Sequence, residues 1–282
     1  MFEFFRDLDR RWVFLAMLLA VAVPILAGAR FPEEPSQMVR SVFHAIDNLP
    51  EGSRVLMALD YDPASEGELH PMAAAFTRQC ALKNHKMYFM TLWPPGPVMI
   101  QKQINMLQRE FPDYEYGIDY VNMGFRPGYE GPIKLIVTDL KRAISADVHG
   151  TSLDQIPLTR DLKNIQQMDM IINVSAGYPG AKEWVLYAAT PYGIPTVAGT
   201  TGVQSPLLMP YIPNQLTGML GAIKAAAEYE QMLIDEYPQL KDNRQAQEAL
   251  RRMGPQLVAH VFLIVLILIG NTIFFIERRR SR

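Results

Sequence analysis

The chain has 282 residues and a single cysteine, Cys80, so it can form no internal disulfide and has no CxxC pair for a metal or a redox site. Cysteine usage therefore does not identify the compartment. An excess of basic charge is also missing, because 27 Lys and Arg residues stand against 29 Asp and Glu residues, with a formal net charge of -2. Proteins that coat nucleic acid normally carry a basic patch and a high pI. We therefore expect no nucleic-acid partner.

Familiar spacings of catalytic, metal-binding and cofactor-binding residues are absent as well. The five histidines show no HxxxH or HExxH spacing, and we predict no metal site from them. These histidines are His44, His70, His85, His149 and His260. No GxGxxG fingerprint follows the first predicted strand, and Ser175 is not in a GxSxG elbow because Asn173 stands two residues before it. No cofactor can be assigned from the sequence.

Two long apolar runs stand near the ends of the chain, at residues 12–29 and 257–276. Each is about as long as the roughly 20 residues that a helix needs to cross a bilayer. We interpret both as transmembrane helices, the first as a signal anchor. A cleaved signal peptide is the alternative for the first run, since the small residues 27–29 resemble a cleavage site. Arginines in the tails 1–11 and 277–282 predict that both tails are cytoplasmic.

The residues between the two runs are then predicted to be extracytoplasmic. We expect a linker at 30–51, an α/β domain at 52–237 and a membrane-proximal helix at 238–256. Residues 214–237 read as one long helix. Its small residues allow close approach of another helix or another subunit, although such residues more often reflect ordinary packing than a contact between subunits. They are Gly218, Gly221, Ala222, Ala225 and Ala226.

Polar residues inside the second apolar run bear on the partners. His260 and Asn271 would be costly against lipid, so we expect them to face another helix. The predicted partners are the lipid bilayer and either further copies of this chain or another membrane protein.

Short β-rich apolar runs alternate with helical patterns from about residue 52 to residue 201. This alternation is typical of βαβ units and a parallel sheet covered on both faces. We predict an α/β fold with an open, mostly parallel, Rossmann-like (doubly wound) sheet of about five strands. The predicted strands are 54–60, 86–92, 118–123, 168–174 and 195–198.

The loop after the first predicted strand is rich in acids. Asp60, Asp62 and Glu66 are suited to a divalent cation or to a general acid and base pair. With His149 they form our candidate catalytic set. The alternative is that they are ordinary acids in the first turn of a helix, where the helix dipole favours negative charge.

Ligands of open parallel sheets bind beyond the carboxyl ends of the strands, so the later loops also hold candidates. Arg126 follows the third strand and is suited to a carboxylate or phosphate. The loops after the fourth and fifth strands offer hydroxyls and backbone amides, and an anion is expected on the amides around Gly180. The predicted ligand-binding residues are Arg126, Ser175, Gly177, Gly180, Thr200 and Thr201.

These loops suit a ligand, yet no complete catalytic set is recognisable. The sequence therefore favours a membrane-anchored, non-catalytic binding or assembly protein that recognises a small ligand or a protein partner. One alternative is a membrane-bound hydrolase or transferase that uses Asp60, Asp62 and Glu66. A second alternative is an accessory subunit of a transporter.

Overall fold

A computed structural model describes residues 9–28 and 34–280. The chain divides into two compact units, one comprising Glu33–Ala246 and the other comprising Met1–Pro32 with Gln247–Arg282. The predicted tails at 1–11 and 277–282 lie partly outside the described residues. Each unit is described separately below.

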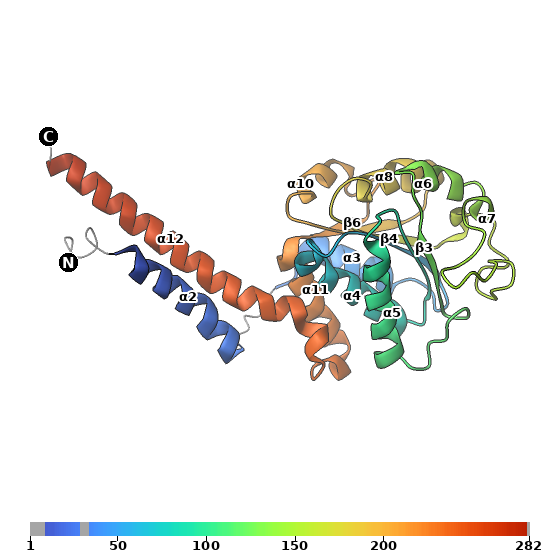
Figure 1. The fold of residues 1–282 in the computed structure, drawn as a ribbon, viewed down its shortest axis with the longest axis horizontal. Coiled ribbons are helices and arrows are strands. Elements are labelled where there is room, and N and C mark those ends of the chain that lie inside the picture. The colour runs from blue at the N-terminus through green and yellow to red at the C-terminus, as the bar shows by residue number, and fades with distance from the viewer. Residues whose placement is uncertain (1–8, 29–33, 281–282) are drawn as a thin grey trace. The chain divides into compact units, whose positions relative to one another are not determined.

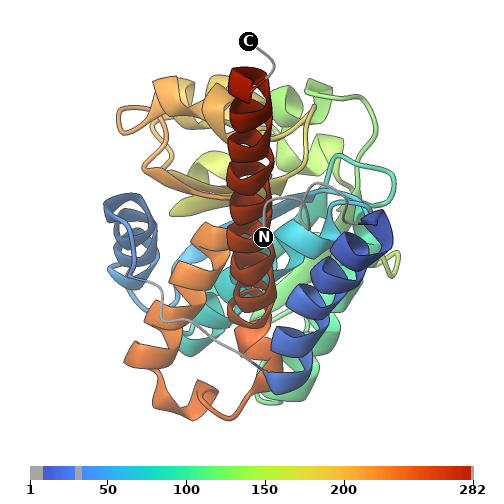
Figure 2. The same cartoon turned by 90° about the vertical axis from the view of Figure 1, so that its left-hand side faces the viewer.

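The smaller unit contains two apolar helices that pack against each other, α2 (Arg10–Ala27) and α12 (Glu248–Arg280). Both helices are long and apolar enough to cross a membrane. Helix α2 starts where the Asp9 carboxylate accepts a hydrogen bond from the amide of Arg11 at 2.9 Å. Helix α12 is continuous (Figures 1 and 2) and includes the whole second apolar run. The predicted membrane-proximal helix at 238–256 begins only at Glu248, because two 3-10 turns precede it.

The larger unit is built on a single sheet of six parallel strands in the order β3-β2-β1-β4-β5-β6. The strands are β1 (Arg54–Asp60), β2 (Lys86–Thr91), β3 (Tyr120–Phe125), β4 (Met170–Ser175), β5 (Thr196–Thr200) and β6 (Gly218–Gly221). Strands that are buried on both faces read as continuous apolar runs, which is why the first five were recognisable. The predicted α/β class and parallel sheet are confirmed. The order of the strands is that of dinucleotide-binding folds and reverses between β1 and β4.

Helices cover both faces of the sheet (Figure 1). One face carries α4 (Glu66–Leu82) and α5 (Gly96–Glu110), together with α3 (Gln37–Asp47) and α11 (Ala222–Glu236). The other face packs on shorter helices, where Ile136 and Trp184 meet Leu56, Tyr88 and Val121 of the strands. The short elements of this face are α6 (Gly131–Ile136), α7 (Leu140–Ala143), η1 (Ile165–Gln167), α8 (Ala181–Trp184), η2 (Val185–Ala189), α9 (Thr190–Tyr192), α10 (Ser205–Leu208) and η3 (Met209–Tyr211). Two short turns, η4 (Pro238–Leu240) and η5 (Arg244–Gln247), follow α11 in the chain.

The prediction of one helix at 214–237 was wrong. Its first part is strand β6, and α11 begins only at Ala222, whose backbone has a φ of 63°. A β-carbon on Gly218 would lie 2.9 Å from Cγ2 of Val42 and 3.3 Å from the carbonyl oxygen of Met38. The missing side chain therefore makes room for α3 within the same chain, which gives this glycine a packing role that needs no second subunit.

The interval 30–51, predicted as a linker, contains helix α3. Its buried residues are Val39, Val42, Phe43 and Ile46, a spacing that places them on one side of a helix. The side chain of Ser36 accepts a hydrogen bond from the amide of Val39 at the start of the helix. The segment is an integral part of the α/β unit, because its apolar side packs on β6 and α11.

Candidate functional site

The carboxyl ends of the strands meet at the edge of the sheet where its order reverses. Asp60 ends β1 and pairs in register with Ser175, which ends β4. The loops after β2, β3, β4 and β5 surround this point and contribute to the lining of two pockets. In sheets of this kind ligands bind at this edge, so we treat the two pockets as the candidate site.

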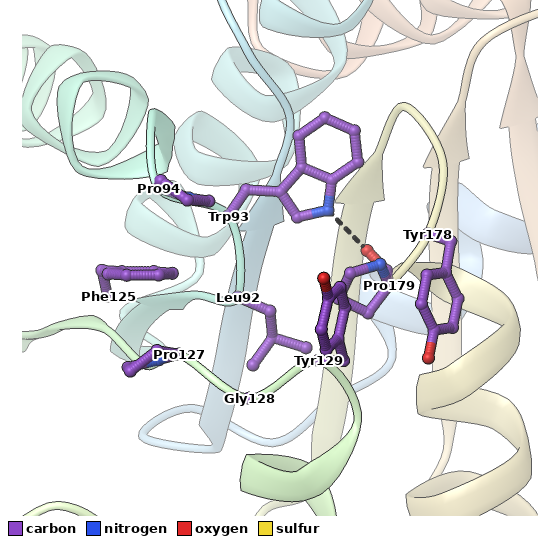
Figure 3. A pocket seen from close by; sticks show the side chains of 9 residues that line it. All are labelled: Leu92, Trp93, Pro94, Phe125, Pro127, Gly128, Tyr129, Tyr178 and Pro179. Atoms are coloured by element: carbon purple, nitrogen blue, oxygen red, sulfur yellow. Dashed lines mark hydrogen bonds between the residues drawn. The ribbon is translucent and has the colours of Figure 1, made fainter.

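The first pocket, here called the aromatic pocket, has a volume of about 440 Å³. Figure 3 shows its nine lining residues, none of which is charged. They are Leu92, Trp93, Pro94, Phe125, Pro127, Gly128, Tyr129, Tyr178 and Pro179. Phe125 is the last residue of β3, and the other residues belong to the loops after β2, β3 and β4. Because β1 lies between β2 and β4, the pocket lies across the end of β1.

Specific contacts hold the walls of the aromatic pocket in place. The indole Nε1 of Trp93 donates a hydrogen bond of 2.7 Å to the carbonyl oxygen of Pro179 and so joins the loops after β2 and β4 (Figure 3). The rings of Tyr129 and Tyr178 are stacked, with centroids 5.7 Å apart and planes at 22°. These two side chains are 65% and 58% exposed, so ring surface is open to a ligand from solvent.

A carboxylate holds the ring of Tyr178 in this stack. The hydroxyl of Tyr178 donates a hydrogen bond of 2.5 Å to Oε2 of Glu130. This bond lowers the pKa of Glu130 to about 2 and raises the pKa of Tyr178 to about 12. At neutral pH Tyr178 is therefore a neutral donor and Glu130 a charged acceptor, so the bond persists.

The second pocket, here called the polar pocket, has a volume of about 270 Å³. It lies between the loops after β4 and β5 and is lined by Ser175, Gly177, Tyr178, Ala181, Lys182, Glu183, Thr200, Gln204, Leu207 and Leu208. Tyr178 lines both pockets. Three of the predicted ligand-binding residues, Ser175, Gly177 and Thr200, therefore lie together in one cavity.

The amides around Gly180 are already occupied. The amide of Gly180 donates to Oε2 of Glu183 at 2.8 Å, and the amide of Ala181 donates to the hydroxyl oxygen of Ser175 at 3.0 Å. These two amides therefore have partners within the chain, and an anion on the amides around Gly180 stays a prediction. A β-carbon on Gly180 would lie only 2.3 Å from the carbonyl oxygen of Gly177. Glycine is required here by close packing of the loop.

Two further predicted residues line neither pocket. The carbonyl of Thr201 accepts a hydrogen bond of 3.0 Å from the hydroxyl of Ser205, which shapes the loop after β5. The Nη2 atom of Arg126 donates to the carbonyl oxygens of Met123 and Ala146 at 2.7 and 2.9 Å. Arg126 thus links the end of β3 to the segment that follows α7, because its guanidinium donates hydrogen bonds to backbone carbonyls of both.

Asp60 is completely buried beneath the two pockets. Its carboxylate accepts hydrogen bonds from the amide of Leu92 at 2.6 Å, from Nδ2 of Asn173 at 2.7 Å and from Nε1 of Trp184 at 2.9 Å. Burial opposes the charged form and raises its pKa to about 6, although the hydrogen bonds act in the opposite direction. This side chain connects β1 to β2, β4 and α8.

The other candidate catalytic residues have separate partners. Asp62 accepts a hydrogen bond from the amide of Ser65 at 2.9 Å, and Glu66 pairs with Nζ of Lys102 at 2.5 Å. His149 is exposed, and its ring packs edge-on against Tyr116 with centroids 5.0 Å apart. Asp60, Asp62, Glu66 and His149 therefore do not form one cluster. In residues 9–28 and 34–280, no three or more His, Cys, Asp or Glu side chains are grouped so that they could hold a metal ion.

The aromatic pocket was not predicted as a site. Its sequence signal is the presence of aromatic residues and prolines at or shortly after the ends of three strands, as in Trp93-Pro94, Phe125 and Tyr178-Pro179. No protein-family model matches the chain, and a search of curated proteins finds no significant match. Inference about function therefore rests on the two pockets and on the apolar helices.

Proposed function

We propose that this chain is a membrane-anchored, non-catalytic binding protein whose Rossmann-like unit holds a small ligand at the carboxyl edge of the sheet. The observation that carries the proposal is the aromatic pocket at the reversal of strand order. Its volume of about 440 Å³ lies within the range of roughly 300–1,000 Å³ that is usual for small-molecule sites. A mostly apolar lining with a few fixed polar groups is also usual for such sites.

The lining of the aromatic pocket indicates what part of a ligand it takes. Trp93, Phe125 and Tyr129 offer aromatic surface, and none of the lining residues is charged. A flat apolar group gains from burial and from ring stacking, which contributes about 0.5–1.5 kcal/mol for each aromatic pair beyond the buried area. We therefore expect a ligand that carries an aromatic or similarly flat ring.

A dinucleotide suits this edge poorly, although the strand order is the one that dinucleotide-binding proteins use. In those proteins a glycine-rich turn after the first strand cradles the phosphates. Here the corresponding loop carries Asp62, and α4 begins with Glu66 and Glu68, the second of which accepts a hydrogen bond of 2.8 Å from the amide of Gly202. Negative charge at this place opposes a pyrophosphate.

Binding can be tested on the full chain purified in mild detergent from the membranes of its own cell. Native mass spectrometry should detect a small molecule bound to the wild type, and Tyr129→Ala should lose it because the variant removes one wall of the aromatic pocket. Ile118→Ala is the matched control, since Ile118 is 48% exposed and precedes β3 at the opposite edge of the sheet. Equal occupancy in Tyr129→Ala and the wild type would contradict the proposal.

Anchoring by both apolar helices is part of the proposal. The arginines of the two tails favour cytoplasmic ends, which would leave the α/β unit outside. Protease added to intact spheroplasts should then digest residues 33–246. Protection of this unit until the membrane is broken would place it in the cytoplasm, and a mature N-terminus near residue 30 would show that the first helix is a cleaved signal.

A further inference from the structure

The aromatic and polar pockets share a wall. Tyr178 lines both, with Pro179 facing the aromatic pocket and Gly177 the polar one. Both pockets open at the carboxyl edge of the sheet, on the two sides of the loop that follows β4. A ligand that crosses the exposed ring of Tyr178 can therefore place one end in each pocket.

The polar pocket offers hydrogen-bond donors that the protein itself does not use. In the part of the chain that the structure describes, the ammonium of Lys182 and the side-chain amide of Gln204 have no hydrogen-bond or ion-pair partner. Ser175 is only 2% exposed, and its hydroxyl oxygen accepts from the amide of Ala181. A hydroxyl can donate as well as accept, which leaves the proton of Ser175 for a ligand in this cavity.

The charges around the polar pocket favour an anion with a single negative charge. Lys182 is the one cation among its lining residues, and Glu183 is the one acid. Glu183 is nearly buried, and its Oε2 already accepts from the amide of Gly180. The charges of Lys182 and Glu183 cancel before a ligand binds. A ligand carboxylate brings one uncompensated negative charge and a phosphate dianion brings two, so the carboxylate meets less repulsion from Glu183.

We propose that the two pockets form one site for a small aromatic monocarboxylate, with its ring in the aromatic pocket and its carboxylate on Lys182 and Ser175. This assignment rests on the proposed binding function and names the class of its ligand. It does not depend on the amides at the start of α8, because those of Gly180 and Ala181 are already bonded. Gln204 supplies a further donor at the same end of the site.

A matched pair of probes isolates the charge. 4-Phenylbutyrate and its neutral amide, 4-phenylbutyramide, have the same ring and chain length. Isothermal titration of the full chain in detergent micelles, with empty micelles as the blank, should show that the carboxylate binds about tenfold more tightly, a difference of about 1.4 kcal/mol. Lys182→Met should remove this advantage and leave the binding of the amide unchanged, whereas Lys182→Arg should retain most of it.

A control variant and the affinities of both probes distinguish failure of the monocarboxylate assignment from failure of the proposed binding function. Lys163→Met removes an exposed lysine that precedes β4 at the opposite edge, and it should change neither affinity. Equal binding of both probes to the wild type, or an unchanged preference in Lys182→Met, would overturn the monocarboxylate assignment. Sensitivity of both probes to Tyr129→Ala would still support the aromatic pocket. No binding of either probe at about 1 mM, the weak end of specific affinities, would overturn the ligand class alone.

Discussion

Acidification should stabilise the α/β unit through Asp60. This carboxylate is fully buried and accepts from Leu92, Asn173 and Trp184. Even with these donors, burial raises its pKa from the ordinary 3.8 to about 6. The protonated form is therefore favoured by the folded state more than by the unfolded chain.

The sign and size of the effect follow from the two pKa values. Because the folded-state pKa is the higher one, the stabilisation from Asp60 is fully present below about pH 4 and is lost as the pH rises through about 6. Each pH unit between the two values corresponds to about 1.4 kcal/mol. The free energy of unfolding should therefore lose about 2 kcal/mol through this group between pH 4 and pH 7.

The variant Asp60→Asn removes the titration while it keeps the shape of the side chain. Urea unfolding of the full chain in micelles can be followed by tryptophan fluorescence, since the indole of Trp184 contacts Asp60. The difference in unfolding free energy between wild type and variant should be about 2 kcal/mol larger at pH 4 than at pH 7. Other titrating groups are common to both proteins and cancel. Asp161→Asn, at a carboxylate that is 77% exposed, is the control for loss of one acidic charge.

A difference that stays constant with pH would refute this reasoning. So would one that grows towards pH 7, because it would mean that the donors favour the charged carboxylate more than burial opposes it. The variant should also be less stable than the wild type at every pH, since an asparagine amide cannot accept from all the donors that surround Asp60.

Two further substitutions test packing around the sheet by urea unfolding. Gly180→Ala should destabilise the unit by about 1–3 kcal/mol, because its β-carbon would lie 2.3 Å from the carbonyl oxygen of Gly177. The control is Gly131→Ala, whose β-carbon would have no atom within 4 Å and which should change stability by less than about 0.5 kcal/mol. Equal effects of the two substitutions would contradict the close approach at Gly180. Arg78→Met should cost about 3–5 kcal/mol, because Glu110 loses the partner held at 2.8 Å by a guanidinium that is only 2% exposed. A loss below about 1 kcal/mol would show that this pair is effectively solvated.

Much of the fold was readable because its strands are long apolar runs between turns. Strand β6 escaped because Gly218 and Gly221 with two apolar residues between them carry neither an alternating nor a β-branched pattern. Helix α3 is a different case. Its buried residues Val39, Val42, Phe43 and Ile46 have helical spacing in the sequence, so the linker interpretation overlooked a signal that was present.

The candidate site was predictable only in part. The rule that ligands lie beyond strand ends singled out Ser175 and Thr200, and both line the polar pocket. That they bind a ligand there stays a prediction. The aromatic pocket forms because β2 and β3 lie on one side of β1 while β4 lies on its other side. This strand order is set by long-range packing. Arg126 was predicted to bind an anion, but its Nη2 atom donates to the carbonyl of Met123, three residues away, and to that of Ala146, 20 residues away.

Asp60 links the two pockets and bears on the question of catalysis. A carboxyl group with a pKa of about 6 is well suited to act as a general base when it can reach a substrate. Here it is sealed from solvent, and its oxygens are bonded to the amide of Leu92 beside the aromatic pocket and to Trp184 in the helix beside the polar pocket. The hydrogen bonds of Asp60 therefore fix backbone beside the aromatic pocket and a side chain beside the polar pocket. The carboxyl group with the pKa best suited to proton transfer is therefore held in hydrogen bonds that shape the site, an arrangement that agrees with the proposed binding function.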